Sequence, residues 1–126
     1  FVMNNTVYGM TGGQMAPTTM IGQRTTSSKD GRILADSGEN FDVVKTMRGL
    51  AIAYLARTSV TNPANVAKTK KYVRKALEKQ RDCKGFSLVE VLVPCPTNWG
   101  MTPPKSMEYI NDVMTKQYEL GEFIDR

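Results

Sequence analysis

Hydrophobic and polar positions along the chain follow two alternating patterns. Three short runs are rich in apolar residues, as buried strands are: Phe1–Met3, Ala53–Val60 and Phe86–Val93. Three other segments carry apolar residues at helical spacing: Phe41–Gly49, a segment capped by Asn62 that runs to about Arg81, and Lys105–Lys116. Strands that alternate with helices pair in parallel through right-handed crossovers. The pattern therefore predicts an α/β fold, a three-layer sandwich around a mostly parallel sheet.

Two loops follow predicted strands directly. Residues 4–14, NNTVYGMTGGQ, follow the first strand, and residues 94–104, PCPTNWGMTPP, follow the third. Ligand loops of parallel α/β sheets leave the carboxyl ends of the strands, so both loops are candidates for a binding site. Residues 22–40 are polar and glycine-punctuated, and we expect a long exposed loop there. Because Phe1 already lies within an apolar run, we expect residues 1–126 to be the C-terminal part of a domain whose upstream part is missing.

Composition narrows the class of protein. The 126 residues are 40% hydrophobic and 23% charged, as in an ordinary soluble domain, and no apolar stretch is long enough to cross a bilayer. The net charge is +5, but the basic residues concentrate between Lys68 and Lys79 in a predicted amphipathic helix, so we expect neither nucleic-acid nor membrane binding. Histidine is absent, which excludes histidine-dependent triads and histidine metal sites here. The two cysteines favour a reducing compartment, the cytoplasm.

The residues after the first strand suit a metal or an anionic ligand. Asn4 and Asn5 offer neutral amide oxygens, which a hard cation such as Mg²⁺ accepts as ligands. A simple turn after the strand is the alternative interpretation of this pair. Gly9, Gly12 and Gly13 would let the backbone approach a ligand closely, although a tight turn would also use glycine.

Four motifs together resemble one enzyme family. They are NNTVYGMTGGQMAPTT, GLAIAYLART, GFSLVEVLVPCPTNWGMTP and the closing ELGEF, and they resemble the beta subunit of 2-oxoacid:ferredoxin oxidoreductases of the ketoisovalerate and oxoglutarate type. The resemblance implies part of a thiamine diphosphate-binding domain. It implies that Asn5 gives Mg²⁺ a side-chain oxygen and Val7 a backbone carbonyl, with a charged aspartate ligand lying upstream of this chain. It also implies cofactor contacts along the loop: Tyr8, Gly9, Met10, Thr11, Gly12, Gly13 and Gln14.

The proline-framed loop adds a second candidate. Taken alone, Cys95 is most simply a small packed side chain, but the resemblance implies that it is the fourth ligand of a 4Fe-4S cluster whose other ligands lie outside the chain. Asn98 and Trp99 could orient this loop and shield a cofactor, or pack at a subunit contact. Cys83 has no counterpart in the family and is expected to be an ordinary thiol at a helix end.

The implied reaction is oxidative decarboxylation of a 2-oxoacid to acyl-CoA, with electrons passed via the cluster to ferredoxin. The implied partners are alpha and gamma- or delta-type subunits, ferredoxin, the 2-oxoacid and coenzyme A. Within the resembled family, Met10 stands where pyruvate-specific members have an asparagine, which implies a substrate side chain larger than methyl. One oxoglutarate branch has a lysine where Gly12 stands, so the resemblance implies a branched-chain apolar 2-oxoacid rather than a dicarboxylate. No catalytic base is identified in the chain. Two alternatives remain: a catalytically silent α/β module, and a non-oxidative thiamine diphosphate decarboxylase or synthase, against which Cys95 argues.

Two further charged features have structural interpretations. Glu90 lies within an apolar run and is predicted to pair with a basic neighbour on the sheet rather than to act on the cofactor. The lysines at positions 68, 71, 75 and 79 are predicted to form a solvated helix face, with docking of an acidic ferredoxin as the alternative.

Overall fold

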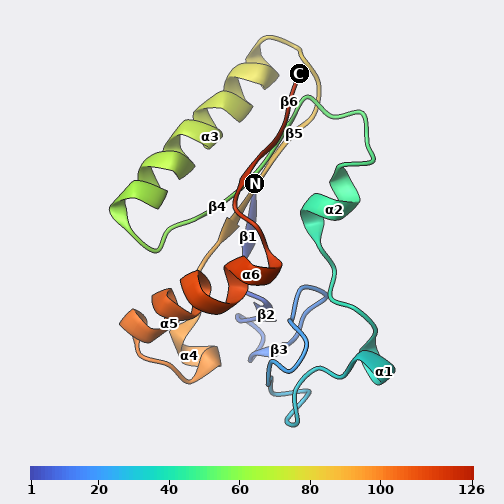
Figure 1. The fold of residues 1–126 in the computed structure, drawn as a ribbon, viewed down its shortest axis with the longest axis vertical. Helices are drawn as coiled ribbons and strands as arrows, with labels where there is room; N and C mark the ends of the chain where they lie inside the picture. Colours follow the sequence, from blue (N-terminus) through green and yellow to red (C-terminus); the bar gives the residue numbers. More distant parts are fainter.

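A four-stranded sheet forms the centre of the computed structural model, which describes residues 1–126 (Figure 1). Its spatial order is β1 (Val2–Asn4), β5 (Ser87–Leu92), β4 (Tyr54–Ser59) and β6 (Gly121–Asp125). The first three strands are parallel, and β6 runs antiparallel to β4. A separate small hairpin pairs β2 (Val7–Tyr8) with β3 (Gln14–Met15). The helical segments are α1 (Leu34–Ser37), α2 (Val43–Met47), α3 (Pro63–Arg81), α4 (Pro96–Trp99), α5 (Pro103–Tyr109), the π-helical η1 (Ile110–Met114) and α6 (Thr115–Gln117).

The predicted α/β class is confirmed, because a mostly parallel sheet carries helices on both faces. The long helix α3 packs on one face, where its Ala76 joins an apolar cluster with residues of β4 and β5: Tyr54, Ala56, Val89 and Val91. The short helix α2 packs on the other face, in the cluster Val43, Val44, Ile52, Leu55 and Leu88. The last element predicted from the sequence was the helix at residues 105–116, which follows β5. The structure adds the edge strand β6 and the hairpin β2–β3, which lie in segments without a long apolar run.

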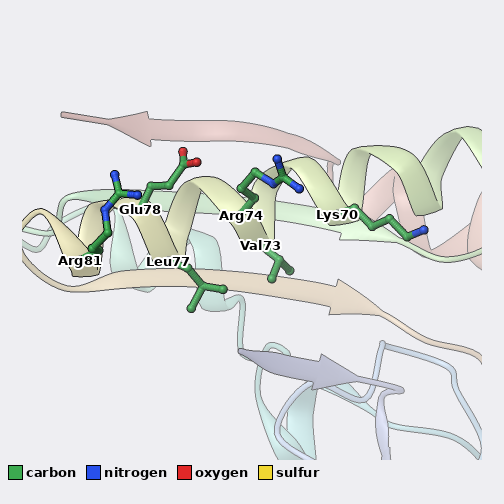
Figure 2. Close-up of a pocket in the computed structure, with 6 residues that line it drawn as sticks. All are labelled: Lys70, Val73, Arg74, Leu77, Glu78 and Arg81. Atoms are coloured by element: carbon green, nitrogen blue, oxygen red, sulfur yellow. The ribbon is translucent and has the colours of Figure 1, made fainter.

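Helix α3 begins where the sequence predicts, but fewer of its apolar side chains are buried than expected. The Asn62 side chain accepts a hydrogen bond from the Asn65 backbone N–H at 2.9 Å, and Pro63 occupies the first turn. Of the apolar residues that lie at helical spacing in this segment, only Ala76 is fully buried. Figure 2 shows Val73 and Leu77 on an open flank of the helix among Lys70, Arg74 and Arg81, and Leu77 is 54% exposed.

The predicted solvated lysine face is wrong for two of its four members. Lys75 Nζ lies 3.0 Å from Glu122 and 2.5 Å from Asp125, and Lys79 Nζ lies 2.8 Å from Asp125. The Tyr54 hydroxyl also donates to Glu122 at 2.6 Å. Hydrogen bonds from the two lysines lower the pKa of Asp125. These lysines therefore attach α3 to β6, an arrangement that the sequence could not indicate without the strand.

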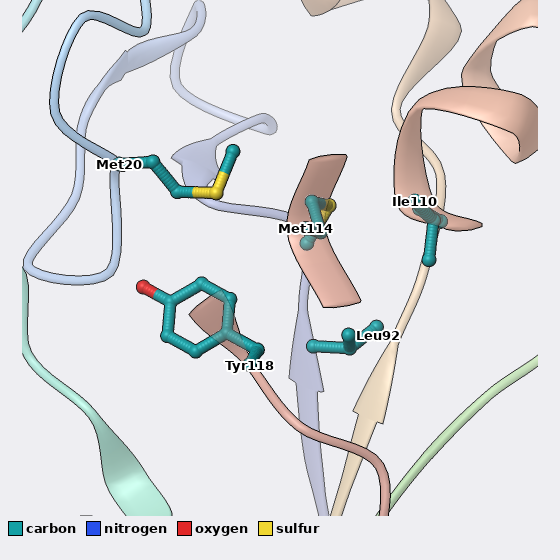
Figure 3. Packing of buried hydrophobic residues seen from close by; sticks show 5 residues of the cluster. All are labelled: Met20, Leu92, Ile110, Met114 and Tyr118. Carbon is teal, nitrogen blue, oxygen red and sulfur yellow. The ribbon is translucent and has the colours of Figure 1, made fainter. Parts of the chain in front are cut away.

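A third apolar cluster lies at the carboxyl ends of the parallel strands. It joins Leu92 of β5 to η1 and to the segment that follows the hairpin, as Figure 3 shows, through Met20, Leu92, Ile110, Met114 and Tyr118. All five side chains are buried. This cluster supports the loops that follow β1 and β5. No helix in the structure has the length and apolar character that crossing a bilayer requires.

Candidate cofactor-binding site

The glycine-rich loop and the cysteine-containing loop start side by side. Strands β1 and β5 are neighbours, with Asn4 opposite Leu92 in the parallel register. The Val93 backbone N–H donates to the Asn4 carbonyl at 3.0 Å, so contact continues just past the strand end. The prediction that both loops leave carboxyl strand ends is confirmed.

The side chains of Asn4 and Asn5 differ in burial and in hydrogen bonding. Asn4 is buried, and its Oδ1 accepts hydrogen bonds from the Thr6 N–H at 3.0 Å and from the Thr18 hydroxyl at 2.9 Å. The turn places Thr6 at a φ of 61°, in the left-handed region. Asn5 is only half-buried, and its Oδ1 accepts a longer hydrogen bond of 3.3 Å from the Val7 N–H. The turn interpretation therefore holds for Asn4, while the Asn5 carboxamide is the more accessible of the two.

The predicted cofactor loop is a surface hairpin. Its tip runs from Gly9 to Gly13 and is closed by a hydrogen bond of 2.8 Å from the Gly13 N–H to the Tyr8 carbonyl. Thr11 Oγ1 donates to Gln14 Oε1 at 2.7 Å, and Gln14 Nε2 donates back to the Thr11 carbonyl at 2.9 Å. Val7, the first residue of β2 in this hairpin, is buried. The exposed side of the loop comprises Tyr8, Met10, Thr11 and Gly12.

Side chains of the cysteine loop hold the glycine loop in place. Asn98 Nδ2 lies 3.3 Å from the Gly9 carbonyl and 3.2 Å from Cys95 Sγ, and it donates to both. Trp99 Nε1 donates to the Asn5 carbonyl at 3.1 Å. The indole also packs against Tyr109, with ring centroids 5.2 Å apart. These hydrogen bonds fit the interpretation in which Asn98 orients this loop, and Trp99 makes a second connection between the loops.

The close approach of these loops explains two of the glycines. A Cβ on Gly9 would lie 3.2 Å from both Asn5 Nδ2 and Asn98 Nδ2, and 3.5 Å from Cys95 Sγ. A Cβ on Gly13, which has a φ of +80°, would lie only 2.7 Å from Asn98 Oδ1. Cys95 therefore sits directly beside the candidate cofactor loop. Cys83 is an exposed free thiol just after α3, as expected.

A buried ionic network lies below the loops, and the predicted partner of Glu90 is confirmed. Glu90 Oε2 accepts from Arg57 Nε at 2.5 Å, and Arg57 Nη2 donates to Asp42 Oδ1 at 2.5 Å. The guanidinium lies 5.0 Å from the Tyr118 ring centroid. Partial burial acts to raise the pKa of Asp42, but hydrogen bonds from Arg57 and from backbone N–H groups outweigh it and lower the pKa. Sequence reasoning missed Arg57, although a lone arginine in an apolar strand was a signal.

A second arginine ties the polar segment 22–40 to the site. Most side chains of this segment are exposed, but the Arg32 side chain is buried and donates only to backbone carbonyls: those of Ala16, Pro17, Thr19, Ser37, Gly38 and Glu39. Gln23 Nε2 donates to Thr6 Oγ1 at 2.7 Å. The segment therefore braces the turn after β1, a role that its polar composition did not reveal.

The residues present fit part of a cofactor site. Asn5 and Val7 offer neutral oxygens, whereas Glu90, the carboxylate that contacts this turn, is already bonded to Arg57 and Asn4. No group of three or more histidine, cysteine, aspartate or glutamate residues converges anywhere in the chain. A pocket of about 400 Å³ opens beside the loop, lined by the polar residues Asn4, Asn5 and Thr18, by Tyr8, and by apolar residues: Val2, Met3, Val7, Ala16, Pro17, Phe41, Val43, Met47 and Leu88. Such lining suits a ligand with both polar and apolar parts.

Comparisons with known proteins agree with this geometry. Residues 1–91 match the family model described as thiamine pyrophosphate enzyme, C-terminal TPP binding domain; thiamine pyrophosphate is another name for thiamine diphosphate. No solved structure matches the chain.

Several curated relatives carry oxidoreductase names. The chain is 41% identical over 127 residues to ketoisovalerate oxidoreductase subunit VorA of Methanothermobacter marburgensis, covering 100% of this chain and 27% of that protein. It is 33% identical to 2-oxoglutarate synthase subunit KorB of Archaeoglobus fulgidus, covering 88% of this chain and 38% of that protein. It is 31% identical to 2-oxoacid:ferredoxin oxidoreductase subunit beta of Saccharolobus solfataricus, covering 93% of this chain and 31% of that protein. The resemblance drawn from the motifs is confirmed, and the chain belongs to the thiamine pyrophosphate enzyme family, within its C-terminal TPP binding domain.

Proposed function

We propose that this chain is the C-terminal part of the thiamine diphosphate-binding domain of a 2-oxoacid:ferredoxin oxidoreductase. The enzyme would convert a 2-oxoacid and coenzyme A to acyl-CoA and CO₂ and pass the electrons to ferredoxin. The observation that carries the proposal is the junction of the two loops, where Asn98 bonds both the Gly9 carbonyl and Cys95 Sγ. Relatives named as subunits of a ketoisovalerate oxidoreductase, a 2-oxoglutarate synthase and a 2-oxoacid:ferredoxin oxidoreductase support it, and the chain spans 27–38% of their lengths.

Each loop residue has a proposed task. Asn5 and Val7 hold Mg²⁺ with a side-chain oxygen and a backbone carbonyl, and the hairpin backbone from Tyr8 to Gln14 surrounds the diphosphate. Cys95 is one ligand of a 4Fe-4S cluster that other residues complete. Bound thiamine diphosphate supplies the carbanion chemistry, while the protein supplies binding and orientation. The two free thiols suit a reducing, cytoplasmic setting.

The proposed partners are alpha and gamma- or delta-type subunits, ferredoxin and coenzyme A. The proposed substrate is a branched-chain 2-oxoacid. The two ketoisovalerate subunits from Methanothermobacter are 41% and 39% identical to the chain, against 33% for the oxoglutarate subunit described above. Met10, which is fully exposed at the hairpin tip, leaves an apolar side chain free on that surface.

Titration calorimetry and a coupled assay test the proposal. We expect the full-length protein to bind Mg²⁺-thiamine diphosphate tightly and residues 1–126 alone to bind it weakly, because this chain offers Mg²⁺ no unpaired carboxylate beside Asn5. With its partner subunits, the protein should reduce ferredoxin in a reaction that requires both 3-methyl-2-oxobutanoate and coenzyme A. CO₂ release without ferredoxin reduction would favour a non-oxidative decarboxylase, and a full-length protein that binds no cofactor would refute the proposal.

A further inference from the structure

A fully buried carboxylate contacts the candidate cofactor loop without belonging to it. Glu90 lies within β5 and has no exposed surface. Its Oε2 accepts a hydrogen bond from Arg57 Nε at 2.5 Å, and its Oε1 accepts one from Asn4 Nδ2 at 2.7 Å. The two oxygens of one side chain thus join the ion pair within the sheet to the residue at which the loop begins.

Asn4 transmits this constraint to the turn. Its Oδ1 is the acceptor for the Thr6 N–H and for the Thr18 hydroxyl, at 3.0 and 2.9 Å. Thr6 is 1% exposed and adopts a φ of 61°, which a β-branched residue keeps only where its surroundings enforce it. The orientation of the Asn4 carboxamide therefore decides whether the Thr6 N–H has an acceptor. It also influences the direction in which Asn5 and Val7 leave the strand.

We propose that Glu90 is a positioning residue for the cofactor site. Arg57 engages Oε2, so Oε1 is the oxygen that faces Asn4 and keeps the carboxamide nitrogen toward the sheet and its oxygen toward the turn. Glu90 itself touches no cofactor in this scheme. The inference rests on the proposed function of the loop, and it adds a residue that holds Asn5 and Val7 in place through Asn4.

The Glu90→Gln variant changes this arrangement with little change in shape. Glutamine has one oxygen, and the charge-assisted hydrogen bond directs that oxygen toward Arg57. Its NH₂ group then meets Asn4 Nδ2, which is also a donor. The Asn4 carboxamide must rotate by half a turn, which removes the acceptor of the Thr6 N–H. In the full-length protein we expect the Kd for Mg²⁺-thiamine diphosphate to rise on the order of 10–100-fold, as when other residues that orient metal ligands are replaced.

A reciprocal exchange tests whether the effect passes through Asn4. Combining Asn4→Asp with Glu90→Gln reverses one hydrogen bond, because the new carboxylate accepts from the glutamine NH₂ and still accepts from Thr6 and Thr18. The net charge is unchanged, and we expect the Kd to return close to the wild-type value. Asp42→Asn is the matched control, since it removes the other carboxylate on Arg57 but retains a capping side chain for α2. It should lower thermal stability and leave the Kd unchanged.

Titration calorimetry and thermal unfolding of the full-length proteins decide the matter. Weak binding by Glu90→Gln with recovery in the double variant supports the proposal. Wild-type affinity in Glu90→Gln, or a double variant that stays weak, overturns it. If Glu90→Gln does not fold, the double variant decides alone: tight binding supports the proposal, and failure to fold or bind overturns it. A wild-type protein that binds no cofactor would instead refute the proposed function, so the two failures are distinguishable.

Discussion

Neighbouring glycines in the candidate cofactor loop are constrained in different ways. Gly12 and Gly13 both have positive φ values, +117° and +80°. A Cβ on Gly12 would meet only Gln14 Nε2 at 3.8 Å, whereas one on Gly13 would lie 2.7 Å from Asn98 Oδ1. Gly12 is therefore required by backbone conformation alone, and Gly13 also by contact with the side chain that joins the two loops.

Replacing Gly13 with alanine should cost more stability than the same change at Gly12. The left-handed backbone alone costs about 1–2 kcal/mol per non-glycine residue. Gly13→Ala must in addition displace Asn98 from the Gly9 carbonyl and from Cys95 Sγ. Urea unfolding of residues 1–126 carrying each variant measures the difference. Equal losses in the two variants would show that the Asn98 contact contributes nothing.

Cys95→Ser addresses the second loop in the assembled full-length enzyme. Serine keeps the size of the side chain but is a poor ligand for iron, so we expect one cluster signal to vanish from the electron paramagnetic resonance spectrum of the reduced protein. Cys83→Ser, which changes an exposed thiol after α3, is the control and should leave the spectrum unchanged. A normal spectrum for Cys95→Ser would refute the ligand role.

At the scale of elements, α3 combines local and tertiary determinants. Its first turn is set locally by the Asn62 side chain and Pro63, which the sequence predicts. Its second half is attached to β6 by the ion pairs of Lys75 and Lys79 with carboxylates that lie far along the chain. These pairs are partly exposed, so each contributes on the order of 0–1 kcal/mol. Ala76 adds an apolar contact with β4 and β5.

The cap of α3 gives a local prediction. Asn62→Ala removes the acceptor of the Asn65 N–H and should lower the free energy of unfolding by about 1 kcal/mol. Asn62→Asp keeps an acceptor and places a negative charge at the helix amino terminus, where it is favourable, so it should retain the wild-type stability. Chemical denaturation of residues 1–126 checks both variants. A loss in the aspartate variant as large as that in the alanine variant would contradict the capping role.

At the scale of the whole molecule, the ionisable groups define a pH range of stability. Asp42, Glu122 and Asp125 have lowered pKa values in the folded state. Their stabilising contribution is present above the pKa values of the unfolded chain and is lost as pH falls through the folded values. Burial raises the pKa of Tyr118 to about 12, so the folded state favours the neutral phenol and this contribution is lost as pH rises toward that value.

We therefore expect the free energy of unfolding of residues 1–126 to be roughly constant from about pH 5 to pH 9. It should fall below about pH 4 and again above about pH 10, where carboxyl and phenol groups of the unfolded chain titrate. Denaturation across this range measures the profile. Tyr118→Phe should reduce the alkaline loss, and Asp125→Asn should reduce the acidic one. Stability that increases below pH 4 would contradict the assignment of these groups.

Much of the fold could be predicted from the sequence, and less of the site. The central strands and the principal helices are found where apolar periodicity places them, and Asn62 caps α3 as predicted. The sequence predicted that Glu90 forms an ion pair but did not identify Arg57 as its partner. A buried carboxylate requires a positively charged neighbour, but the local sequence does not indicate which strand carries that neighbour. Thr18 and Gln23 bond to the turn after β1, and Arg32 bonds to the carbonyls of the segment that follows the hairpin. All three lie in polar segments whose composition resembles that of any loop.

Local patterns in the sequence determined the three parallel strands β1, β4 and β5, the helix start at Asn62 and the loops at strand ends, because periodicity and capping depend on residues a few positions apart. Only the tertiary structure decided the strand order β1-β5-β4-β6, the attachment of β6 to α3 and the contact of Cys95 with the glycine loop. The hydrogen bond between Asn4 and Glu90 joins residues 86 positions apart. Such pairs depend on which segments become neighbours when the sheet assembles, and no local pattern encodes that choice.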